Sequence, residues 1–277
     1  MRLATLRLQN RTVAVRVDED SLVELGRPDV GAVLADPGGL AAAATTEGPR
    51  HDAGAAIFAT LVPHPTKVVC VGLNYRTHIQ EMGRDLPQYP TLFCKFEDTL
   101  IGSSDDIRKP AETDALDWEA ELAVVVGKQV RRATTAQAEE AIAGFTILND
   151  ITCRDWQFRT REWLQGKNWD STTPVGSYLV TPDEVGGVRP ALAVRCDVDG
   201  TTMQKDNTGD LLFDPVALVE YVSTMIRLNP GDMIATGTPG GVGHARKPPV
   251  YLAVGQTVVT EIEGLGRLEN RVVADRR

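Results

Sequence analysis

The sequence lacks several features that would point to particular classes of protein. No apolar run approaches the roughly 20 residues that a transmembrane helix needs, and Lys and Arg form only short pairs such as Arg131-Arg132. With a net charge of −9, the chain has no basic surface suited to nucleic acid or anionic membranes. Aromatic residues make up only 5% of the chain, which leaves few rings to stack on sugars.

The cysteines give no sign of a disulfide framework or a zinc site. There is no CxxC spacing, and three of the four lie in or beside apolar runs (Cys70, Cys94, Cys153 and Cys196). We therefore expect reduced, buried thiols that pack as small apolar residues. The first residues carry charges where a signal peptide needs an apolar core, so we expect a cytoplasmic protein.

What the chain does have is enough apolar sequence for a large core, with 277 residues of which 42% are hydrophobic. Alternating segments at 2–8 and 11–17 predict a β-hairpin, and the Ala/Gly-rich stretch 31–60 predicts one or two weak helices. Pro63-His64-Pro65 then forms an extended connector. We predict a small N-terminal α/β domain at 1–65 and a larger domain at 66–277.

The larger domain is predicted to be mostly β-structure. Strands are expected near 67–73, 120–126, 144–149, 175–180, 192–198, 232–236, 257–263 and 267–273. A helix is expected over 214–227, where Asp214 can cap it and Pro215 suits its first turn. Helices and strands do not alternate regularly, which favours an α+β fold on a mixed or antiparallel sheet over a TIM barrel or a doubly wound sheet.

The segment around Glu119 and Glu121 carries two acidic residues on an otherwise apolar strand. Strand residues two apart share a face, about 6.5–7 Å apart, and burying both carboxylates is costly unless a cation lies between them. Asp150 ends the next apolar run, so the three carboxylates suggest an oxygen-only site for Mg²⁺ or Mn²⁺. The alternative is that Glu119 and Glu121 lie on the solvated face of an edge strand, and periodicity alone does not separate the two.

Further polar residues follow the ends of predicted strands. On a short helix over 75–82, His78 and Glu81 would share a face, as in a general base held by a carboxylate, or they form a chance surface pair. Arg154 and Gln157 lie four and seven residues after Asp150 in a segment that reads as helical, so the three would line one wall.

Two more segments carry candidate binding groups. Lys167 stands between Gly166 and Asn168-Trp169, an unusual setting for a purely solvated lysine. The glycine-rich loop 235–243 follows a strand and offers backbone N–H groups and the Thr238 hydroxyl, which suit a carboxylate or a phosphate. Taken alone, this loop is equally well read as a flexible turn.

Together these segments resemble the fumarylacetoacetate hydrolase family over about residues 67–275. The resemblance rests on five segments in the family's order: Asn74-Tyr75-x-x-His78-x-x-Glu81, Asp117-Trp118-Glu119-Ala120-Glu121-Leu122-Ala123-Val124-Val125, Asn149-Asp150 with Arg154 and Gln157, Gly166-Lys167, and Thr236-Gly237-Thr238-Pro239. It implies the family's mixed β-roll, usually a homodimer. Two positions depart from the common pattern and concern pocket shape: Ser177 and Phe96 stand where many members have proline.

The resemblance also implies roles for the candidate residues. Glu119, Glu121 and Asp150 would bind Mg²⁺ or Mn²⁺. His78 and Glu81 would form the water-activating dyad on a lid over the substrate. The groups implied to contact substrate oxygens are Lys167, Arg154, Gln157, Gly237 and Thr238.

The implied activity is metal-dependent hydrolysis of a C–C bond in an acylpyruvate-type 2,4-dioxo acid, through an enolate that the metal stabilises, with Lys167 holding the developing oxyanion. Oxaloacetate decarboxylation is the first alternative, and isomerisation or dehydration of a 2-oxo acid is another. A purely structural metal site would not require His78 or Lys167. A retaining glycosidase is disfavoured because its two carboxyl groups, about 5–5.5 Å apart, usually come from separate elements.

Overall fold

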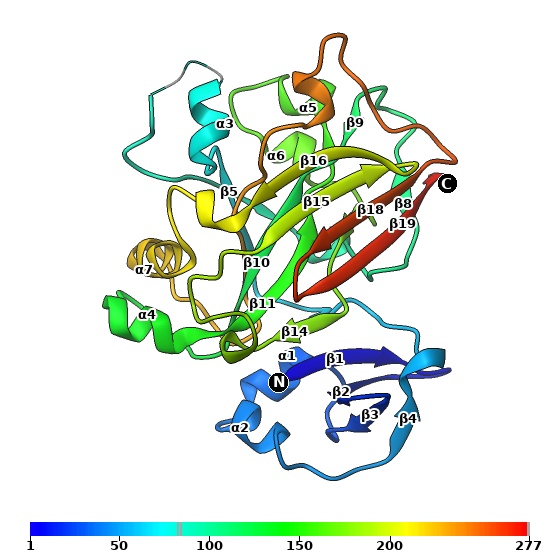
Figure 1. Ribbon diagram of the computed structural model, residues 1–277, viewed down its shortest axis with the longest axis vertical. Helices are drawn as coiled ribbons and strands as arrows, with labels where there is room; N and C mark the ends of the chain where they lie inside the picture. Colours follow the sequence, from blue (N-terminus) through cyan, green and yellow to red (C-terminus); the bar gives the residue numbers. More distant parts are fainter. Residues whose placement is uncertain (82, 84, 276–277) are drawn as a thin grey trace.

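The computed structural model describes residues 1–81, 83 and 85–275, apart from the side chain of Glu81. Its central feature is a ten-stranded sheet that runs the length of the molecule (Figure 1). In spatial order its strands are β4 (Arg50–Asp52), β3 (Ser21–Glu24), β2 (Thr12–Asp18), β1 (Arg2–Arg7), β14 (Tyr178–Val180), β11 (Ile142–Asn149), β10 (Ala120–Val126), β17 (Met233–Ala235), β5 (Val68–Gly72) and β6 (Thr91–Lys95).

A five-stranded sheet packs against the middle of the large one. Its order is β16 (Thr201–Asn207), β15 (Ala193–Val198), β18 (Thr257–Ile262), β19 (Gly266–Ala274) and β8 (Ile107–Lys109). Two short pairs complete the β-structure: β9 (Leu116–Asp117) with β12 (Thr152–Cys153), and β7 (Leu100–Ile101) with β13 (Thr173–Pro174). Most neighbours are antiparallel, while β17 with β5, β13 with β7, and β19 with β8 run parallel. The predicted α+β fold on a mixed sheet is confirmed.

The helices are few and short. They are α1 (Val30–Ala35), α2 (Gly39–Ala43), α3 (Arg76–Glu81), α4 (Thr135–Ala141), α5 (Arg154–Gln157), α6 (Leu164–Lys167) and α7 (Pro215–Met225). The Asp214 carboxylate accepts the Val216 and Ala217 N–H groups, so α7 begins where the capping signal places it. Within the described residues, no helix is long and apolar enough to span a bilayer.

The N-terminal segment extends the large sheet. The predicted hairpin is present as β1 and β2, and β1 also pairs with β14, with Leu3 opposite Leu179. Leu3 lies in the same apolar cluster as Ala123 of β10. The segment after the hairpin is only partly helical, because α1 and α2 are followed by the extended strand β4. The division at residue 65 remains a prediction, since sheet and core run across it.

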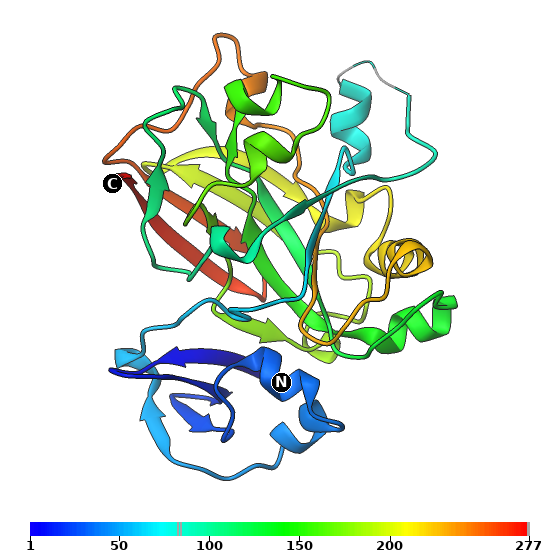
Figure 2. The same cartoon turned by 180° about the vertical axis from the view of Figure 1, so that it is seen from behind.

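The centre of the fold determines where the polar residues lie. Every residue of β10 and β11 is buried, since each strand has neighbours on both sides and the five-stranded sheet covers them. The two strands pair in antiparallel register, with Ala120 opposite Asn149. Figures 1 and 2 show the N-terminal strands at one end of the molecule and α3 and α5 at the other. Glu121 is the only acidic residue of β10 and lies at the start of that strand, beside the end of β11.

Candidate active site

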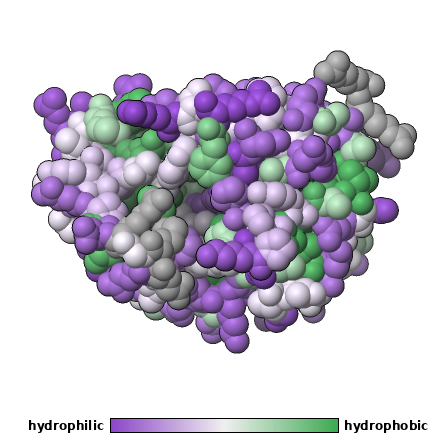
Figure 3. Space-filling model, turned by 90° about the horizontal axis from the view of Figure 1, so that it is seen from above, coloured by the Kyte–Doolittle hydropathy of each residue, from purple (hydrophilic) through white to green (hydrophobic). Residues whose placement is uncertain are grey.

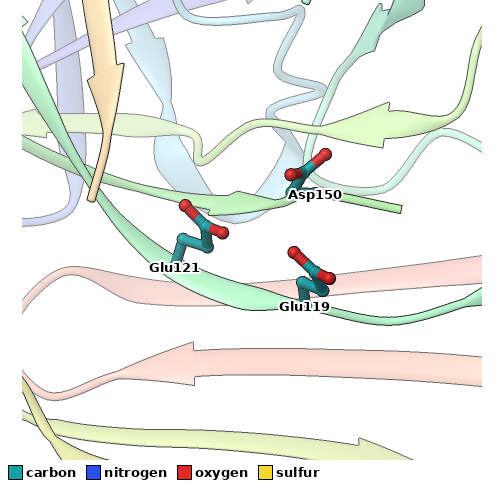
Figure 4. A group of neighbouring side chains, drawn as sticks. All are labelled: Glu119, Glu121 and Asp150. Carbon is teal, nitrogen blue, oxygen red and sulfur yellow. The ribbon is translucent and has the colours of Figure 1, made fainter. Parts of the chain in front are cut away.

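Three acidic residues share one buried face of the β9–β10 segment. Asp117, Glu119 and Glu121 alternate along the chain, and Asp150 follows the neighbouring strand β11. Glu119, Glu121 and Asp150 are 8%, 1% and 0% exposed, so a solvated edge strand is excluded. Their ligand atoms all lie within 4.8 Å of one another, and Figure 4 shows the three carboxylates around one common space.

The local backbone holds these carboxylates in place. The Asp150 N–H donates to the Glu119 carbonyl at 2.9 Å, and the Asn149 side-chain oxygen accepts the Glu119 N–H at 2.9 Å. The Asn149 amide also donates to Thr260 Oγ1 of β18 at 2.8 Å. Both strands are therefore tied to each other and to the second sheet, so the carboxylates are positioned before any ligand binds.

Buried cations alternate with the carboxylates along this face. Lys167 Nζ lies 2.9 Å from Glu119 Oε2 and 2.7 Å from Asp150 Oδ2. The Arg154 guanidinium lies between Glu119, at 2.6 Å from Oε1, and Asp117, at 2.8 Å from Oδ2. The structure thus brings together the predicted carboxylates, Lys167 and Arg154, although they come from four separate elements.

Glu121 differs from the other acidic residues of the cluster. None of the ion pairs formed by the described residues includes it, and the Gly237 N–H donates to its Oε2 at 2.8 Å. Burial, together with the negative charges of Asp150 and Glu119, raises the pKa of Glu121 well above its usual range. For Asp150 burial acts in the same direction, but the charges of Lys167 and Lys95 outweigh it and lower the pKa.

The buried charges therefore do not balance. The cluster holds four carboxylates and three cations: Asp117, Glu119, Glu121 and Asp150 with Lys95, Arg154 and Lys167. Among the described residues Glu121 is the carboxylate without a cation partner, and its raised pKa favours the protonated form until a cation binds. Three carboxylates around one space are the donor set of a hard divalent cation, so the residues present fit Mg²⁺ or Mn²⁺.

Arg154 and Gln157 lie side by side at the start and end of α5. Arg154 Nη1 donates to Gln157 Oε1 at 2.9 Å. Burial alone would lower the pKa of the Arg154 guanidinium. The carboxylates of Glu119 and Asp117 together outweigh burial, so the pKa is raised above its usual value. The helix begins only at Arg154, because β12 separates it from Asp150. Asp150 therefore does not share a helix with Arg154 and Gln157, contrary to the expectation from sequence. The ion pairs of Lys167 with Asp150 and Glu119, and of Arg154 with Glu119, connect the two elements.

The segment with His78 begins beside the Glu121 end of the cluster. The Asn74 amide donates to the carbonyls of Thr236 at 2.8 Å and Phe213 at 3.0 Å, which ties the start of α3 to the loop that holds Glu121. His78 lies on α3 and is half-buried. The side chain of Glu81 lies outside the described residues, so the His78–Glu81 dyad remains a prediction.

Thr238 uses its hydroxyl within the protein. Its Oγ1 donates to the Ala120 carbonyl at 3.0 Å and accepts from Gln204 Nε2 at 2.8 Å. Gln204 Oε1 in turn accepts the Ala120 N–H at 2.9 Å. These bonds brace β10 beside Glu119 and Glu121. Direct contact between Thr238 and a substrate remains a prediction.

Sequence reasoning did not assign two of the buried charged residues. Lys95 Nζ lies 2.6 Å from Asp150 Oδ1 and donates to the Ile151 carbonyl at 3.1 Å. In the sequence, Lys95 is marked only by its position at the end of the apolar strand β6. Its neighbour Phe96 was noted because it departs from the family pattern, not because of its contacts. Asp117 carried the same alternation as Glu119 and Glu121, but its partner Arg154 is 37 residues away.

Comparison with known proteins gives a consistent assignment. Residues 67–273 match the family model described as fumarylacetoacetate (FAA) hydrolase C-terminal. One relative, the oxaloacetate tautomerase fahd2, mitochondrial, of Xenopus laevis, is 41% identical over 214 residues, which cover 76% of this chain and 67% of the relative.

Several solved structures match nearly the whole chain, including an isomerase and a hydrolase. One is the 5-carboxymethyl-2-hydroxymuconate delta-isomerase from Mycobacterium smegmatis, with a TM-score of 0.83, 31% identity and 100% of both chains covered. The other is the fumarylacetoacetate hydrolase from psychrophilic Exiguobacterium antarcticum, with a TM-score of 0.88, 31% identity, and 99% of this chain and 100% of that chain covered. On this evidence the chain belongs to the fumarylacetoacetate hydrolase family.

Proposed function

We propose that this protein is an enzyme that interconverts the keto and enol forms of oxaloacetate or a closely similar 2-oxo dicarboxylic acid. The observation that carries the proposal is the alternation of buried charge along one face, from the carboxylates around Glu121 to the guanidinium of Arg154. A 2-oxo dicarboxylate needs both, since one end chelates a cation and the other carries an anion. The oxaloacetate tautomerase of Xenopus laevis supports this substrate class.

Glu119, Glu121 and Asp150 would hold Mg²⁺ or Mn²⁺. When bound, the ion would supply Lewis acidity that favours negative charge on the substrate oxygen. Lys167 is fully buried, and although burial alone lowers its pKa, Asp150 and Glu119 raise it above the usual lysine value. Lys167 is therefore an ammonium donor at neutral pH. It is suited to stabilise the oxygen of the enol form.

The remaining residues position the substrate and move a proton. Arg154 and Gln157 would hold the second carboxylate, because both lie on α5 at the far side of Glu119. His78, with Glu81 as its proposed partner, would take the proton from the carbon next to the oxo group and return it in the reverse direction. Tautomerisation is balanced by two proton transfers. His78 would take the proton from the carbon while the Lys167 ammonium would donate one to the oxo oxygen, and both groups would then exchange protons with solvent to return to their starting forms.

Hydrolysis of an acylpyruvate is the second candidate. It is supported by the fumarylacetoacetate hydrolase from Exiguobacterium antarcticum, which matches 99% of this chain. The same groups would serve, except that His78 would take its proton from water. The expected products, pyruvate and a carboxylic acid, distinguish this reaction from tautomerisation.

The test is a product assay on enolic oxaloacetate, acetylpyruvate and fumarylpyruvate with Mg²⁺ or Mn²⁺. We expect rapid loss of the enol absorbance of oxaloacetate with no pyruvate formed above the uncatalysed control. Release of pyruvate from either acylpyruvate, with no acceleration of the enol–keto exchange of oxaloacetate, would replace the tautomerase by the hydrolase. Full activity after exhaustive chelation, with no residual metal by elemental analysis, would refute the role of the ion.

A further inference from the structure

Three aromatic side chains lie together at the Asp117 end of the charged face. The rings of Phe158 and His244 have centroids 4.9 Å apart, and those of His244 and Tyr251 are 6.3 Å apart. The Tyr251 hydroxyl lies 2.9 Å from His244 Nδ1. We call Phe158, His244 and Tyr251 the aromatic trio. Phe158 is 56% exposed, so the trio borders solvent above buried charged groups.

Backbone hydrogen bonds attach the trio to the residues that hold Arg154. The Phe158 N–H donates to the Arg154 carbonyl at 3.1 Å, and Phe158 directly follows Gln157. The His244 N–H donates at 2.9 Å to Asp117 Oδ2, the oxygen that also accepts Arg154 Nε. The trio is therefore fixed relative to the guanidinium, and these attachments do not depend on the aromatic side chains.

The turn that carries His244 is itself tightly constrained. It is the 3₁₀ helix η5 (Gly243–Ala245), and the Gly243 N–H donates to Asp117 Oδ1 at 2.7 Å. A Cβ at Gly243 would lie 1.9 Å from the Val250 carbonyl oxygen, so only glycine fits. Close packing of this turn on Asp117 brings the His244 backbone to the buried charges.

The trio and α3 lie at opposite ends of the charged face. The start of α3 is tied to the loop beside Glu121, whereas the trio is tied to Asp117. In both Figure 1 and Figure 2, α3 lies to one side and α5 lies with the orange segment that includes residues 243–251 on the other. Glu121 and Asp117 are four positions apart in an extended segment, about 13 Å along the chain. A substrate that extends from Glu121 to Arg154 therefore points toward the trio.

The trio adds bulk rather than charge at this end. Burial and the positive charge of Arg154 lower the pKa of His244, so its imidazole is neutral at neutral pH. On the face shown in Figure 3, hydrophobic residues form separate patches between hydrophilic side chains. A local cluster of rings next to one cation is suited to limit the size of an anionic ligand.

We propose that Phe158, His244 and Tyr251 form the distal wall of the substrate site and restrict the length of the 2-oxo dicarboxylate that Arg154 can hold. The inference rests on the proposed function, because it takes Arg154 as the partner of the second carboxylate. One extra methylene group against a packed wall changes binding by about tenfold or more. The wall thus favours short dicarboxylates over their longer homologues.

The test uses two probes that differ by one methylene group, 2-oxoglutarate and 2-oxoadipate. Their dissociation constants are measured by calorimetry with Mn²⁺ for the wild type, Phe158→Ala and His244→Ala. We expect the wild type to bind 2-oxoglutarate more tightly, and each variant to reduce this preference about tenfold. Ile57→Ala is the matched control, because Ile57 is also 56% exposed but lies in the N-terminal segment, and it should retain the wild-type preference.

Two outcomes would overturn the wall: a wild type with no preference, or an unchanged preference in both alanine variants with wild-type thermal unfolding. Both substitutions keep the backbone N–H bonds to Arg154 and Asp117, so the variants should fold. The same preparations are assayed with oxaloacetate. A wild type that binds the probes with the expected preference but does not accelerate enol–keto exchange would refute the proposed function and leave the wall standing.

Discussion

Asp117 and Glu121 lie on the same face of one buried segment, yet their surroundings are opposite. Asp117 accepts four hydrogen bonds, from the N–H groups of Trp118, Gly243 and His244 and from Arg154 Nε. Glu121 accepts the Gly237 N–H and has no described ion pair. Asp117 is thus fully paired within the protein, whereas Glu121 has one hydrogen bond and no cation partner among the described residues. Asp117 therefore supports the fold, whereas Glu121 is the carboxylate that we propose binds a cation.

The largest expected effect is loss of activity in Glu121→Gln. The amide oxygen can still accept the Gly237 N–H, but the divalent ion loses a charged ligand, so activity should fall below detection. The melting temperature should stay equal or rise, because one of several mutually repelling buried carboxylates is removed. Steady-state assays with saturating Mn²⁺ and thermal unfolding check the two parts. A variant with wild-type turnover would place the ion elsewhere.

The second effect tests whether the proton-transfer group lies at the Glu121 end. His78→Ala should lower kcat by about 10²–10⁴-fold, the usual loss for a general base, while the KM for oxaloacetate changes little. Imidazole added to the assay should restore part of the rate. If kcat is unchanged, the base must be sought elsewhere, with Lys167 as the first candidate.

Asp117→Asn should show the reverse of Glu121→Gln, with its main effect on stability. The amide nitrogen cannot accept N–H groups, and Arg154 would lose one of its two buried carboxylate partners. Breaking a buried ion pair in this way costs about 3–5 kcal/mol. Chemical denaturation of the two variants in parallel measures the difference. Equal stability of Asp117→Asn and the wild type would remove the structural role from Asp117.

The smallest expected effect on stability concerns a partly exposed ion pair outside the site. It provides a comparison with the buried ion pair of Asp117 and Arg154. Arg7 of β1 binds Asp105 through two bonds of 2.8 Å, and both side chains are partly exposed. Arg7 lowers the pKa of Asp105, so the pair stabilises the fold above the pKa of an unfolded aspartate. That contribution is lost as the pH falls below about 4.

The exposed pair should contribute no more than about 1 kcal/mol. The measurement is the free energy of unfolding of wild type and Arg7→Gln between pH 3 and pH 7, in the range where aspartate titrates. The difference should be present at pH 7 and shrink toward the acidic end. A difference that grows as the pH falls would contradict the assignment.

Local patterns predicted the elements whose signals lie close together in the chain. Strand β10 covers the predicted 120–126, and α7 begins after the predicted cap at Asp214. The common face of Glu119 and Glu121 was also predictable, because their alternation sets it before any tertiary contact forms. Periodicity did not predict that this face is buried beside Asp150; the family resemblance implied that.

Contacts between distant segments were not predictable in the same way. Lys95 reaches Asp150 across 55 residues, and β1 pairs with β14 after more than 170 residues. No spacing rule links such positions, since the sheet order brings them together. The aromatic trio was unpredictable for the same reason. Phe158 and His244 come into contact only because α5 and η5 pack beside the ion pair of Arg154 and Asp117.

The most direct measurement is Mn²⁺ binding at neutral pH to the wild type, Glu121→Gln and Asp117→Asn, by equilibrium dialysis with metal analysis. The convergence of Glu119, Glu121 and Asp150, with no cation partner for Glu121 among the described residues, predicts one tightly bound ion per wild-type chain and none in Glu121→Gln. Folded Asp117→Asn should still bind one ion, because Asp117 lies outside the set of three ligands. Wild-type stoichiometry and affinity in Glu121→Gln would contradict the assignment of the cation site.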